Sequence, residues 1–361
     1  MSHLCRRVPG WPVVAVLCAS WAMAQDGPPR NIILVGWDGA QRAHVKECLA
    51  RKELPTLQKL IDEGTMVDID ITTGATDTKA GWTQILTGYK PDITGVWSNA
   101  RYKPVAQGWS VFERLRAHFG ADKIATLAAI GKARHCGEID PPVKERIDAA
   151  TTQAAADATG AKGGKGAKGA RGAKGGKAIK QPGAKPDPFQ IVEENGVKYR
   201  VRAGSPYFGM HQQVDVWDFA LMQDEKVGTR AIELVEKYKD KPMFFFVHFA
   251  EVDHKGHKAG ENSKDYNDAL ISNDTWTGKI IQKLKDLKLY EQTILYVTAD
   301  HGFDEAKTGH GKAPSVFLAT NDRKVSRSGD RADITPTILD RFGVDLSQLK
   351  PPLSGKSLLG K

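Results

Sequence analysis

The sequence predicts an α/β protein with a doubly wound, mainly parallel sheet. Apolar runs of strand length alternate with amphipathic segments of helix length along most of the chain, the pattern of strands that alternate with helices. Three of the runs, residues 31–36, 243–249 and 294–298, are almost entirely apolar, as strands buried on both faces are. Acidic residues and histidines follow each run closely. In open α/β sheets, ligands collect beyond the carboxyl ends of the strands, so these polar residues are candidates for chemistry.

The first 24 residues have the composition of an export signal. Arg6 and Arg7 precede an apolar segment over residues 11–21, and Ala22-Met23-Ala24 has the form of a signal-peptidase site. The apolar segment is too short for a comfortable transmembrane span. We therefore expect cleavage after Ala24, no transmembrane segment in the mature protein, and a periplasmic or secreted location. A retained amphipathic anchor is the alternative.

In order along the chain, the next elements make up the first part of the expected catalytic domain, residues 25–130. They are helical pieces over 47–64, a half-exposed strand over 66–71, a helix over 78–87, a helix over 111–119 and a buried run over 123–130. Pro55 breaks the first helical segment, and Gly64 and Gly88 follow helix ends as C-caps do. Ser110 and Glu113 have the spacing of a capping box.

The second part of the expected catalytic domain, residues 210–361, repeats the alternation. Its predicted elements are an amphipathic helix over 214–238, a strand over 243–249, a loop that carries Asp253 and His257, a helix over 265–287, strands over 294–298 and 315–319, and a helix over 334–342. This order of elements agrees with a mainly parallel sheet.

Between the two parts, residues 131–209 form an expected insertion or cap. It contains six glycines at a period of three, each triplet closed by Lys or Arg, within a predicted disordered linker over residues 158–186. The period resembles collagen, but no proline occupies the triplets. Residues 160–185 carry eight basic and no acidic residues, which accounts for eight of the nine net positive charges of the 361-residue chain. The rest of the chain is nearly neutral, so we expect no specific nucleic-acid binding.

Six side chains with oxygen or nitrogen donors are candidate metal ligands. They are Asp38, Asp253, His257, Asp300, His301 and His310. Three carboxylates and three imidazoles suit two Zn²⁺ ions, with Mn²⁺ or iron as alternatives, whereas Ca²⁺ and Mg²⁺ prefer oxygen alone. Two zinc ions roughly 4 Å apart can stabilise both the attacking and the leaving oxygen of a phosphoryl transfer.

Thr78 is the candidate nucleophile of such a site. It follows a Gly- and Thr-rich turn and opens a predicted helix, whose free N–H groups and positive dipole favour an anion. Thr72, Thr73 and Thr76 compete for the role. Hydrogen bonding within the turn is the alternative role for all of them.

Several motifs resemble those of a known superfamily. Thr87-Gly88-Tyr89-Lys90-Pro91 begins nine residues after Thr78, Asp38 lies in Trp-Asp-Gly, and Asp300 and His301 lie in Ala-Asp-His-Gly. These motifs resemble the alkaline phosphatase superfamily, most closely its type I phosphodiesterase / nucleotide pyrophosphatase branch. The resemblance covers nearly all of the mature chain except roughly residues 131–209.

The resemblance implies a role for each residue. Thr78 would be the nucleophile that forms a phospho-threonine intermediate, and Asn99, about twenty residues later, would bind a phosphoryl oxygen. Asp253, His257 and His310 resemble the first metal site of the family. The second metal site would comprise Asp38, Asp300, His301 and the Thr78 oxygen. The expected protein is therefore an exported two-zinc phosphoester hydrolase that acts on a small substrate, with phosphodiesterase character.

Departures from the branch leave the substrate class open. Ala80 and Gly81 stand where the branch usually has Pro and Asn, and Thr94 stands where it often has His. The sulfatase branch of the superfamily is set aside, because Thr78-Lys79-Ala80-Gly81-Trp82 lacks the Cys or Ser that formylglycine requires.

Three alternative functions remain. A phosphate monoesterase would need extra cationic side chains, and the candidates are the pairs Lys132 with Arg134 and Lys198 with Arg200. For both pairs we expect solvated surface charges instead. A phosphonate hydrolase would use the same metal ligands. A non-catalytic protein that binds polyanions through residues 160–185 is the third alternative.

Cys48 and Cys136 are the two cysteines of the expected mature chain. They lack the spacing of a zinc ribbon. In an oxidising compartment they could form a disulfide, and the sequence does not decide this.

Overall fold

The computed structural model describes residues 27–147, 189–313 and 315–360. The predicted signal over residues 1–24 and the predicted linker over 158–186 lie outside the described residues. Within the described residues, no helix combines the length and the apolar character that a membrane span requires.

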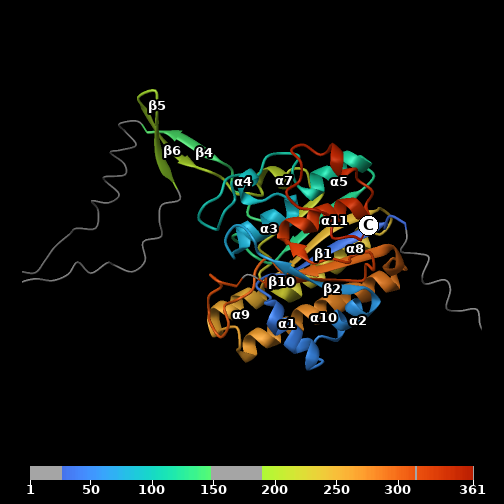
Figure 1. Cartoon of the computed structure of the whole chain (residues 1–361). Helices are drawn as coiled ribbons and strands as arrows, with labels where there is room; N and C mark the ends of the chain where they lie inside the picture. Colours follow the sequence, from blue (N-terminus) through green and yellow to red (C-terminus); the bar gives the residue numbers. More distant parts are fainter. Residues whose placement is uncertain (1–26, 148–188, 314, 361) are drawn as a thin grey trace, which may run out of the picture.

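A large sheet forms the centre of the body (Figure 1). Its strands in the described residues are β1 (Asn31–Trp37), β2 (Thr65–Asp70), β3 (Ala125–Ile130), β7 (Val216–Asp218), β8 (Met243–Phe249), β9 (Thr293–Thr298), β10 (Ser315–Thr320) and β11 (Gly329–Asp330). They lie in the order β11-β2-β10-β9-β1-β8-β3-β7. Only β10 runs antiparallel to its neighbours, which confirms the predicted mainly parallel sheet.

Four adjacent parallel strands, β9, β1, β8 and β3, form the buried middle of this sheet. Asn31 fixes their register at the amino ends: its amide donates to Thr293 Oγ1 at 3.1 Å and accepts from the Met243 N–H at 3.1 Å. A slip of one residue would turn every side chain of a strand to the opposite face. The carboxyl ends of the four strands consequently meet at one edge.

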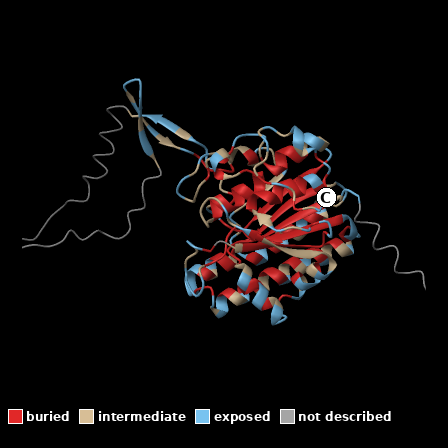
Figure 2. Ribbon diagram, in the orientation of Figure 1, coloured by how far each residue is buried: buried red, intermediate tan, exposed pale blue. Residues whose placement is uncertain are grey.

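Helices cover both faces of the sheet (Figure 1). On one face lie α1 (Arg42–Ala50), α2 (Pro55–Glu63), α8 (Asp224–Tyr238), α9 (Glu251–Ala259) and α10 (Lys264–Asp286). On the other lie α3 (Thr78–Thr87), α4 (Pro91–Thr94), α5 (Val111–Phe119), α7 (Phe208–His211) and α11 (Ile334–Arg341). Short 3₁₀ turns occur at Tyr290–Gln292, Arg331–Asp333 and Leu346–Gln348. Figure 2 shows the strands buried between these layers.

The predicted helix ends are confirmed where a capping signal was present. Ser110 and Glu113 form the capping box of α5, and Gly88 ends α3 with a left-handed φ of 73°. The predicted helix over 214–238 is wrong in its first ten residues. There, β7 pairs with β3, and the Asp215 carboxylate accepts from the Thr126 N–H at 2.8 Å. The pairing of β7 with β3 thus takes the place of a helix, and helix α8 begins only at Asp224.

A second, three-stranded sheet stands away from the body as an arm (Figure 1). It consists of β4 (Val143–Arg146), β5 (Gln190–Glu194) and β6 (Val197–Arg202) in the order β4-β6-β5. The two chain segments that lead into the arm are joined at a neck: the Ser205 N–H donates to the Asp140 carbonyl at 2.8 Å, and the Asp140 N–H donates to Ser205 Oγ at 3.2 Å. At Gly204 a Cβ would lie 2.6 Å from the Pro142 nitrogen, so the neck is tight.

Cys48 and Cys136 are both buried free thiols. No disulfide joins them.

Candidate metal centre and nucleophile

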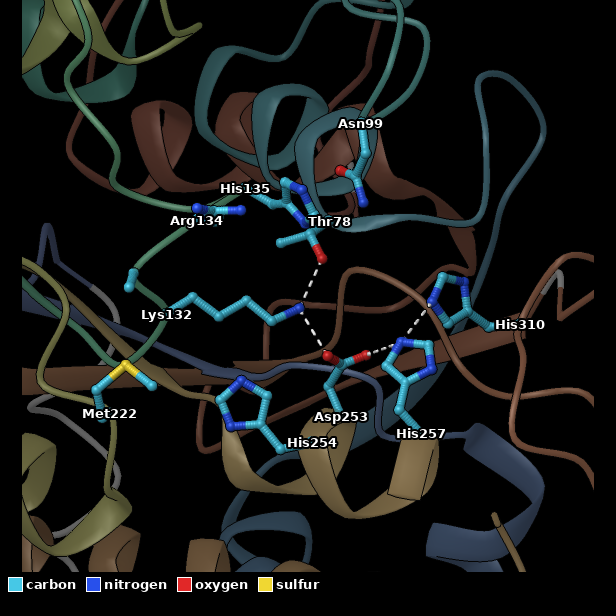
Figure 3. A pocket seen from close by; sticks show the side chains of 11 residues that line it. Thr78, Asn99, Lys132, Arg134, His135, Met222, Asp253, His254, His257 and His310 are labelled. Carbon is cyan, nitrogen blue, oxygen red and sulfur yellow. Dashed lines mark hydrogen bonds and ion pairs between the residues drawn. The ribbon is translucent and has the colours of Figure 1, made fainter. Parts of the chain in front are cut away.

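The ends of the four middle strands bring the candidate residues together. Asp38 directly follows β1, and Asp300 and His301 follow β9. Asp253 lies on α9, which begins two residues after β8, and Lys132 lies two residues beyond β3. Asp38, Asp300 and His301 are fully buried. Lys132 and Asp253 line a pocket of about 500 Å³ (Figure 3). Its lining comprises Thr78, Asn99, Lys132, Ala133, Arg134, His135, Met222, Asp253, His254, His257 and His310.

Asp253 and His257 lie on helix α9, so the predicted loop at these residues is wrong. Their spacing of four places both side chains on one face of the helix. Gly256, between them, lets the helix approach Phe303, because a Cβ there would lie 2.5 Å from the Phe303 ring. Asp224 accepts from the N–H groups of Ala250 and Glu251 at the start of the helix. Packing and capping together offset the low helix propensity of Gly and His in this segment.

Hydrogen bonds to carbonyl groups orient two of the imidazoles. His257 Nδ1 donates to the Thr308 carbonyl at 2.9 Å, and His301 Nδ1 lies 3.0 Å from the Gly302 carbonyl. Each bond leaves Nε2 as the atom with a lone pair, the usual arrangement in a metal-binding histidine. His257 Nε2 lies 3.4 Å from Asp253 Oδ1 and 3.2 Å from His310 Nε2.

The donor atoms meet the requirements of metal binding. Ligand atoms of Asp253, His301 and His310 lie within 4.8 Å of one another, and so do those of Asp38, Asp300 and His301. Asp253 Oδ1, Asp300 Oδ2 and His301 Nε2 are buried and have no hydrogen-bond partner among the described residues. Unpaired buried polar atoms are costly, and a cation between them would remove this cost.

The structure thus brings five of the six predicted ligands together in two groups that share His301. His257 belongs to neither group, although its Nε2 lies near Asp253 and His310 of the first. The grouping therefore differs from the expected one at His301 and at His257.

The charges of the cluster are unbalanced. Burial opposes ionisation of Asp38, but Lys132 and His248 outweigh it and hold its pKa well below the usual range. For Asp300, burial and the neighbouring charge of Asp38 raise the pKa well above the usual range. The negative charges of three buried carboxylates therefore exceed the positive charge of their neighbours. Bound cations would neutralise this excess.

Lys132 was expected to be a solvated surface charge, and this prediction is wrong. Its side chain is only 8% exposed. The ammonium donates to Thr78 Oγ1 at 2.7 Å and lies 2.9 Å from Asp253 Oδ2 (Figure 3). It also donates to Asp38 Oδ1 at 2.8 Å. Its position two residues beyond a buried parallel strand is the signal that could have identified it, since the same signal identified Asp38 and Asp300.

The other three candidate cations lie in two different places. Arg134 lines the pocket with Lys132. Lys198 and Arg200 lie on β6 in the arm and are not among the residues that line the pocket.

Thr78 is the first residue of α3 and the only one of the four threonine candidates that lines the pocket among the described residues. Each of the other three hydroxyls has a partner elsewhere. Thr72 bonds to Asp330, Thr73 to Gln84, and Thr76 to the carbonyl of His310. The structure therefore separates Thr78 from its competitors by position.

Asn99 is tied to the start of α3 by two reciprocal hydrogen bonds. Its Oδ1 accepts from the Lys79 N–H at 2.9 Å, and its own N–H donates to Asp77 Oδ2 at 2.7 Å. Asp77 is also the N-cap of α3, since its Oδ1 accepts from the Ala80 N–H. Because the Asn99 oxygen faces the helix, its amide Nδ2 is left to donate into the pocket.

The sequence analysis did not identify the residues that contact Asp38 and Asp300 and fix their positions. Asp38 Oδ2 accepts from His248 Nε2 at 2.8 Å and from Trp82 Nε1 at 3.2 Å. Gly81 lies against Asp300, where a Cβ would come within 2.5 Å of the Asp300 Cβ. A residue with a side chain at position 81 would not fit this arrangement.

Arg331 fixes the turn that precedes Thr78. It is fully buried, and its guanidinium donates to the carbonyl groups of Thr73, Ala75 and Asp300 at 2.7–3.2 Å. Burial lowers the pKa of Arg331 to about 10, although nearby carboxylates favour its charged form. One side chain thus connects the nucleophile turn to the backbone of a candidate ligand.

Asp224, the residue that caps α9, should make stability depend on pH. Burial and the neighbouring Glu251 raise the pKa of Asp224 to about 7. In the unfolded chain it would ionise near pH 4. The folded state therefore holds the extra proton, and stability should fall as pH rises from about 4 to about 7, by at most about 1.4 kcal/mol per unit.

Asp224→Asn keeps the accepting oxygen and cannot ionise. We expect its melting temperature to exceed that of the wild type near pH 8 and to approach it near pH 4. The measurement is thermal unfolding of both proteins at both pH values. An equal difference at the two pH values would contradict the assignment of the titration to Asp224.

Comparison with known proteins shows the family and the fold of this chain. A family model described as type I phosphodiesterase / nucleotide pyrophosphatase matches residues 32–348. Among solved structures, lipoteichoic acid synthase LtaP from Listeria monocytogenes has a TM-score of 0.53 at 14% identity, with 92% of this chain and 76% of that chain covered. Alkaline phosphatase from the Antarctic bacterium TAB5 has a TM-score of 0.51 at 13% identity, with 88% and 99% covered. At these identities the likeness shows the fold, which is alkaline-phosphatase-like as predicted.

Curated relatives match over shorter segments. The chain is 30% identical over 153 residues to 2,3-bisphosphoglycerate-independent phosphoglycerate mutase from Malacoplasma penetrans, which covers 38% of this chain and 28% of that protein. It is 24% identical over 124 residues to GPI ethanolamine phosphate transferase 2 from Aspergillus fumigatus, which covers 28% and 16%. The matched segments span less than a third of these relatives.

Proposed function

This chain belongs to the type I phosphodiesterase / nucleotide pyrophosphatase family, and we propose that it is a metal-dependent phosphodiesterase with Thr78 as its nucleophile. One observation supports this proposal most. Thr78 is the first residue of α3 and lines the same pocket as Asp253, His257 and His310. The Lys132 ammonium donates hydrogen bonds to both Thr78 and Asp38. A threonine hydroxyl at a helix N-terminus thus lines the same pocket as three candidate metal ligands, which supports a role as nucleophile.

The proposed reaction begins with attack by Thr78 Oγ1 on phosphorus. A new bond forms between that oxygen and phosphorus, and the ester bond to the leaving oxygen breaks. The hydroxyl proton of Thr78 ends on the leaving oxygen, so an alcohol departs and phospho-threonine remains. In the structure, the Lys132 ammonium donates a hydrogen bond to Thr78 Oγ1, which marks this hydroxyl as a place where positive charge favours an oxyanion. Asn99 Nδ2 would donate to a non-bridging phosphoryl oxygen. Water then hydrolyses the phospho-threonine.

Two metal sites complete the proposal. Asp253, His257 and His310, with His301 in reach, would hold the first ion, and Asp38, Asp300 and His301 would hold the second. The mixture of carboxylates and imidazoles favours Zn²⁺, with Mn²⁺ and iron as alternatives. When bound, the ions supply positive charge to the attacking and leaving oxygens.

The distribution of cations in the pocket favours a diester substrate. A monoester carries an additional negative charge and needs further cationic groups. Lys132 is already engaged by two carboxylates, and Lys198 and Arg200 lie on the arm. Arg134 remains at the pocket wall and is the one observation that favours a phosphatase. A phosphonate hydrolase would use the same ligands.

The test compares kcat/KM of the zinc-loaded protein on bis-p-nitrophenyl phosphate, p-nitrophenyl phosphate and p-nitrophenyl phenylphosphonate. We expect the diester to be preferred by about tenfold or more, equivalent to about 1.4 kcal/mol of transition-state stabilisation. A preference for the monoester would make the protein a phosphatase. Turnover of none of the three, with metal bound, would contradict the proposal and favour the polyanion-binding alternative.

Export is a separate part of the proposal and rests on residues 1–24. N-terminal sequencing of protein recovered from the periplasm or medium of expressing cells should find Gln25 as the first residue. Retention of Met1 would contradict it.

A further inference from the structure

Asp38 has one carboxylate oxygen, Oδ1, that is placed to coordinate a metal ion, and this oxygen is hydrogen-bonded to Lys132. Asp38 Oδ2 already accepts hydrogen bonds from His248 Nε2 and Trp82 Nε1. Asp38 Oδ1 accepts from the Lys132 ammonium at 2.8 Å. His301 Nε2 lies 3.6 Å from the same oxygen. An ion in the second site must therefore bind the oxygen that the lysine occupies.

The two carboxylate oxygens of Asp253 face different partners, so Lys132 contacts only one of them. Oδ2 lies 2.9 Å from the Lys132 ammonium, whereas Oδ1 faces His257 Nε2 at 3.4 Å and His301 Nε2 at 3.8 Å. Oδ1 has no hydrogen-bond partner among the described residues. The atoms of the first site are therefore available while Lys132 stays in place.

We propose that Lys132 is a built-in competitor of the second metal ion. The first ion binds with the ammonium in place, and the second binds only when the ammonium leaves Asp38. Both cations need the same buried carboxylate oxygen, and the repulsion between an ammonium and a divalent ion in a buried site forbids shared use. The two metal sites are consequently unequal in affinity, although their ligand sets are alike in number.

The competition also involves the nucleophile. The Lys132 ammonium contacts Thr78 Oγ1 at 2.7 Å, so its departure would release the hydroxyl together with Asp38. The lysine stem is flexible, and its segment lines a pocket of about 500 Å³, which gives the displaced ammonium room. Binding of the second ion would thus free Thr78 Oγ1 as a ligand. This inference goes beyond the proposed function and needs no substrate for its test.

The first test counts metal ions. Wild-type protein, Lys132→Met and the control Arg134→Met are equilibrated with buffered free Zn²⁺ or Co²⁺, and bound metal per chain is measured by elemental analysis and, for Co²⁺, by visible absorption. We expect two unequal binding steps for the wild type and for Arg134→Met, which removes a charge from the same pocket wall. Lys132→Met should tighten the second step by about tenfold or more, because no ion pair has to be broken.

Two outcomes of the count would overturn the proposal. One is equal affinity of both sites in the wild type. The other is an unchanged second step in Lys132→Met. An equal gain in Arg134→Met would also overturn it, since general charge repulsion would then explain the effect.

A second test follows the wild-type protein through the metal titration and uses a variant only to assign one signal. In protein labelled with ¹⁵N-lysine, the buried ammonium of Lys132 should give a protected NMR signal, assigned by its loss in Lys132→Arg. The signal should persist after one equivalent of Zn²⁺ and change or vanish with the second. Loss with the first equivalent, or persistence after both, contradicts the proposed exclusion.

Discussion

Thr78→Ala is expected to abolish turnover of bis-p-nitrophenyl phosphate while the protein stays folded and binds metal. The variant removes the attacking oxygen, and loss of a nucleophile typically costs about 10⁴-fold or more in kcat. The fold should survive because Asp77, and not Thr78, caps α3. The carboxylates and imidazoles of both metal sites remain. The measurements are steady-state kinetics, bound zinc per chain and circular dichroism.

Two further variants and one chemical experiment sharpen this test. Thr78→Ser keeps the hydroxyl and should retain part of the activity. Thr73→Ala removes a hydroxyl that bonds to Gln84 and should keep most of it. Acid quenching of the wild type during turnover should trap phosphate on Thr78, detectable by mass spectrometry. Activity of Thr78→Ala within about tenfold of the wild type would disprove the assigned role.

Arg331→Met should produce the largest loss of stability among substitutions outside the metal sites. It leaves the buried Asp300 carbonyl and the part-buried Ala75 carbonyl without the Arg331 donor, whereas the Thr73 carbonyl keeps its bond from Gln84 Nε2. Each group left unpaired costs about 1–3 kcal/mol, so the total is about 2 kcal/mol or more. Domains have about 5–15 kcal/mol of stability, and such a loss is a large share of it. The free energy of unfolding in urea measures it.

Arg323→Met is the matched control for this experiment. Arg323 is exposed and donates from Nε to the Glu63 carbonyl, so its removal should cost about 1 kcal/mol or less. Arg331→Lys keeps the positive charge but lacks the planar guanidinium with its several N–H donors. We expect its loss of unfolding free energy to lie between those of the two other variants. If Arg331→Met and Arg323→Met were equally stable, the bonds of Arg331 would not carry the stability assigned to them.

Half of the candidate ligands could be selected from the sequence by their position just after buried strands. Asp38, Asp300 and His301 lie within three residues of a strand end, where the geometry of a parallel sheet fixes their location. Lys132 has the same position relative to β3, yet its charge made a surface role the simpler expectation. Burying an ammonium is unfavourable unless carboxylates surround it, and the sequence does not show which carboxylates are near.

Residues that act through long-range contacts could not be predicted in this way. His248 sits inside an apolar strand, and Arg331 lies 31 residues beyond Asp300, whose carbonyl it binds. The helix α9 was missed for a related reason. Its stability comes from the cap at Asp224 and from the contact of Gly256 with Phe303, which are tertiary features that local propensity does not contain.

The tight neck at Asp140 and Ser205 bears on how the arm can change in length. Because the two chain segments are hydrogen-bonded to each other there, the three-stranded arm joins the body at one place, and residues 132–135 of the pocket wall precede that place in the chain. Changes in the length of the arm would therefore leave these four residues in position. The same place is suited to the insertion of a foreign domain by protein engineering.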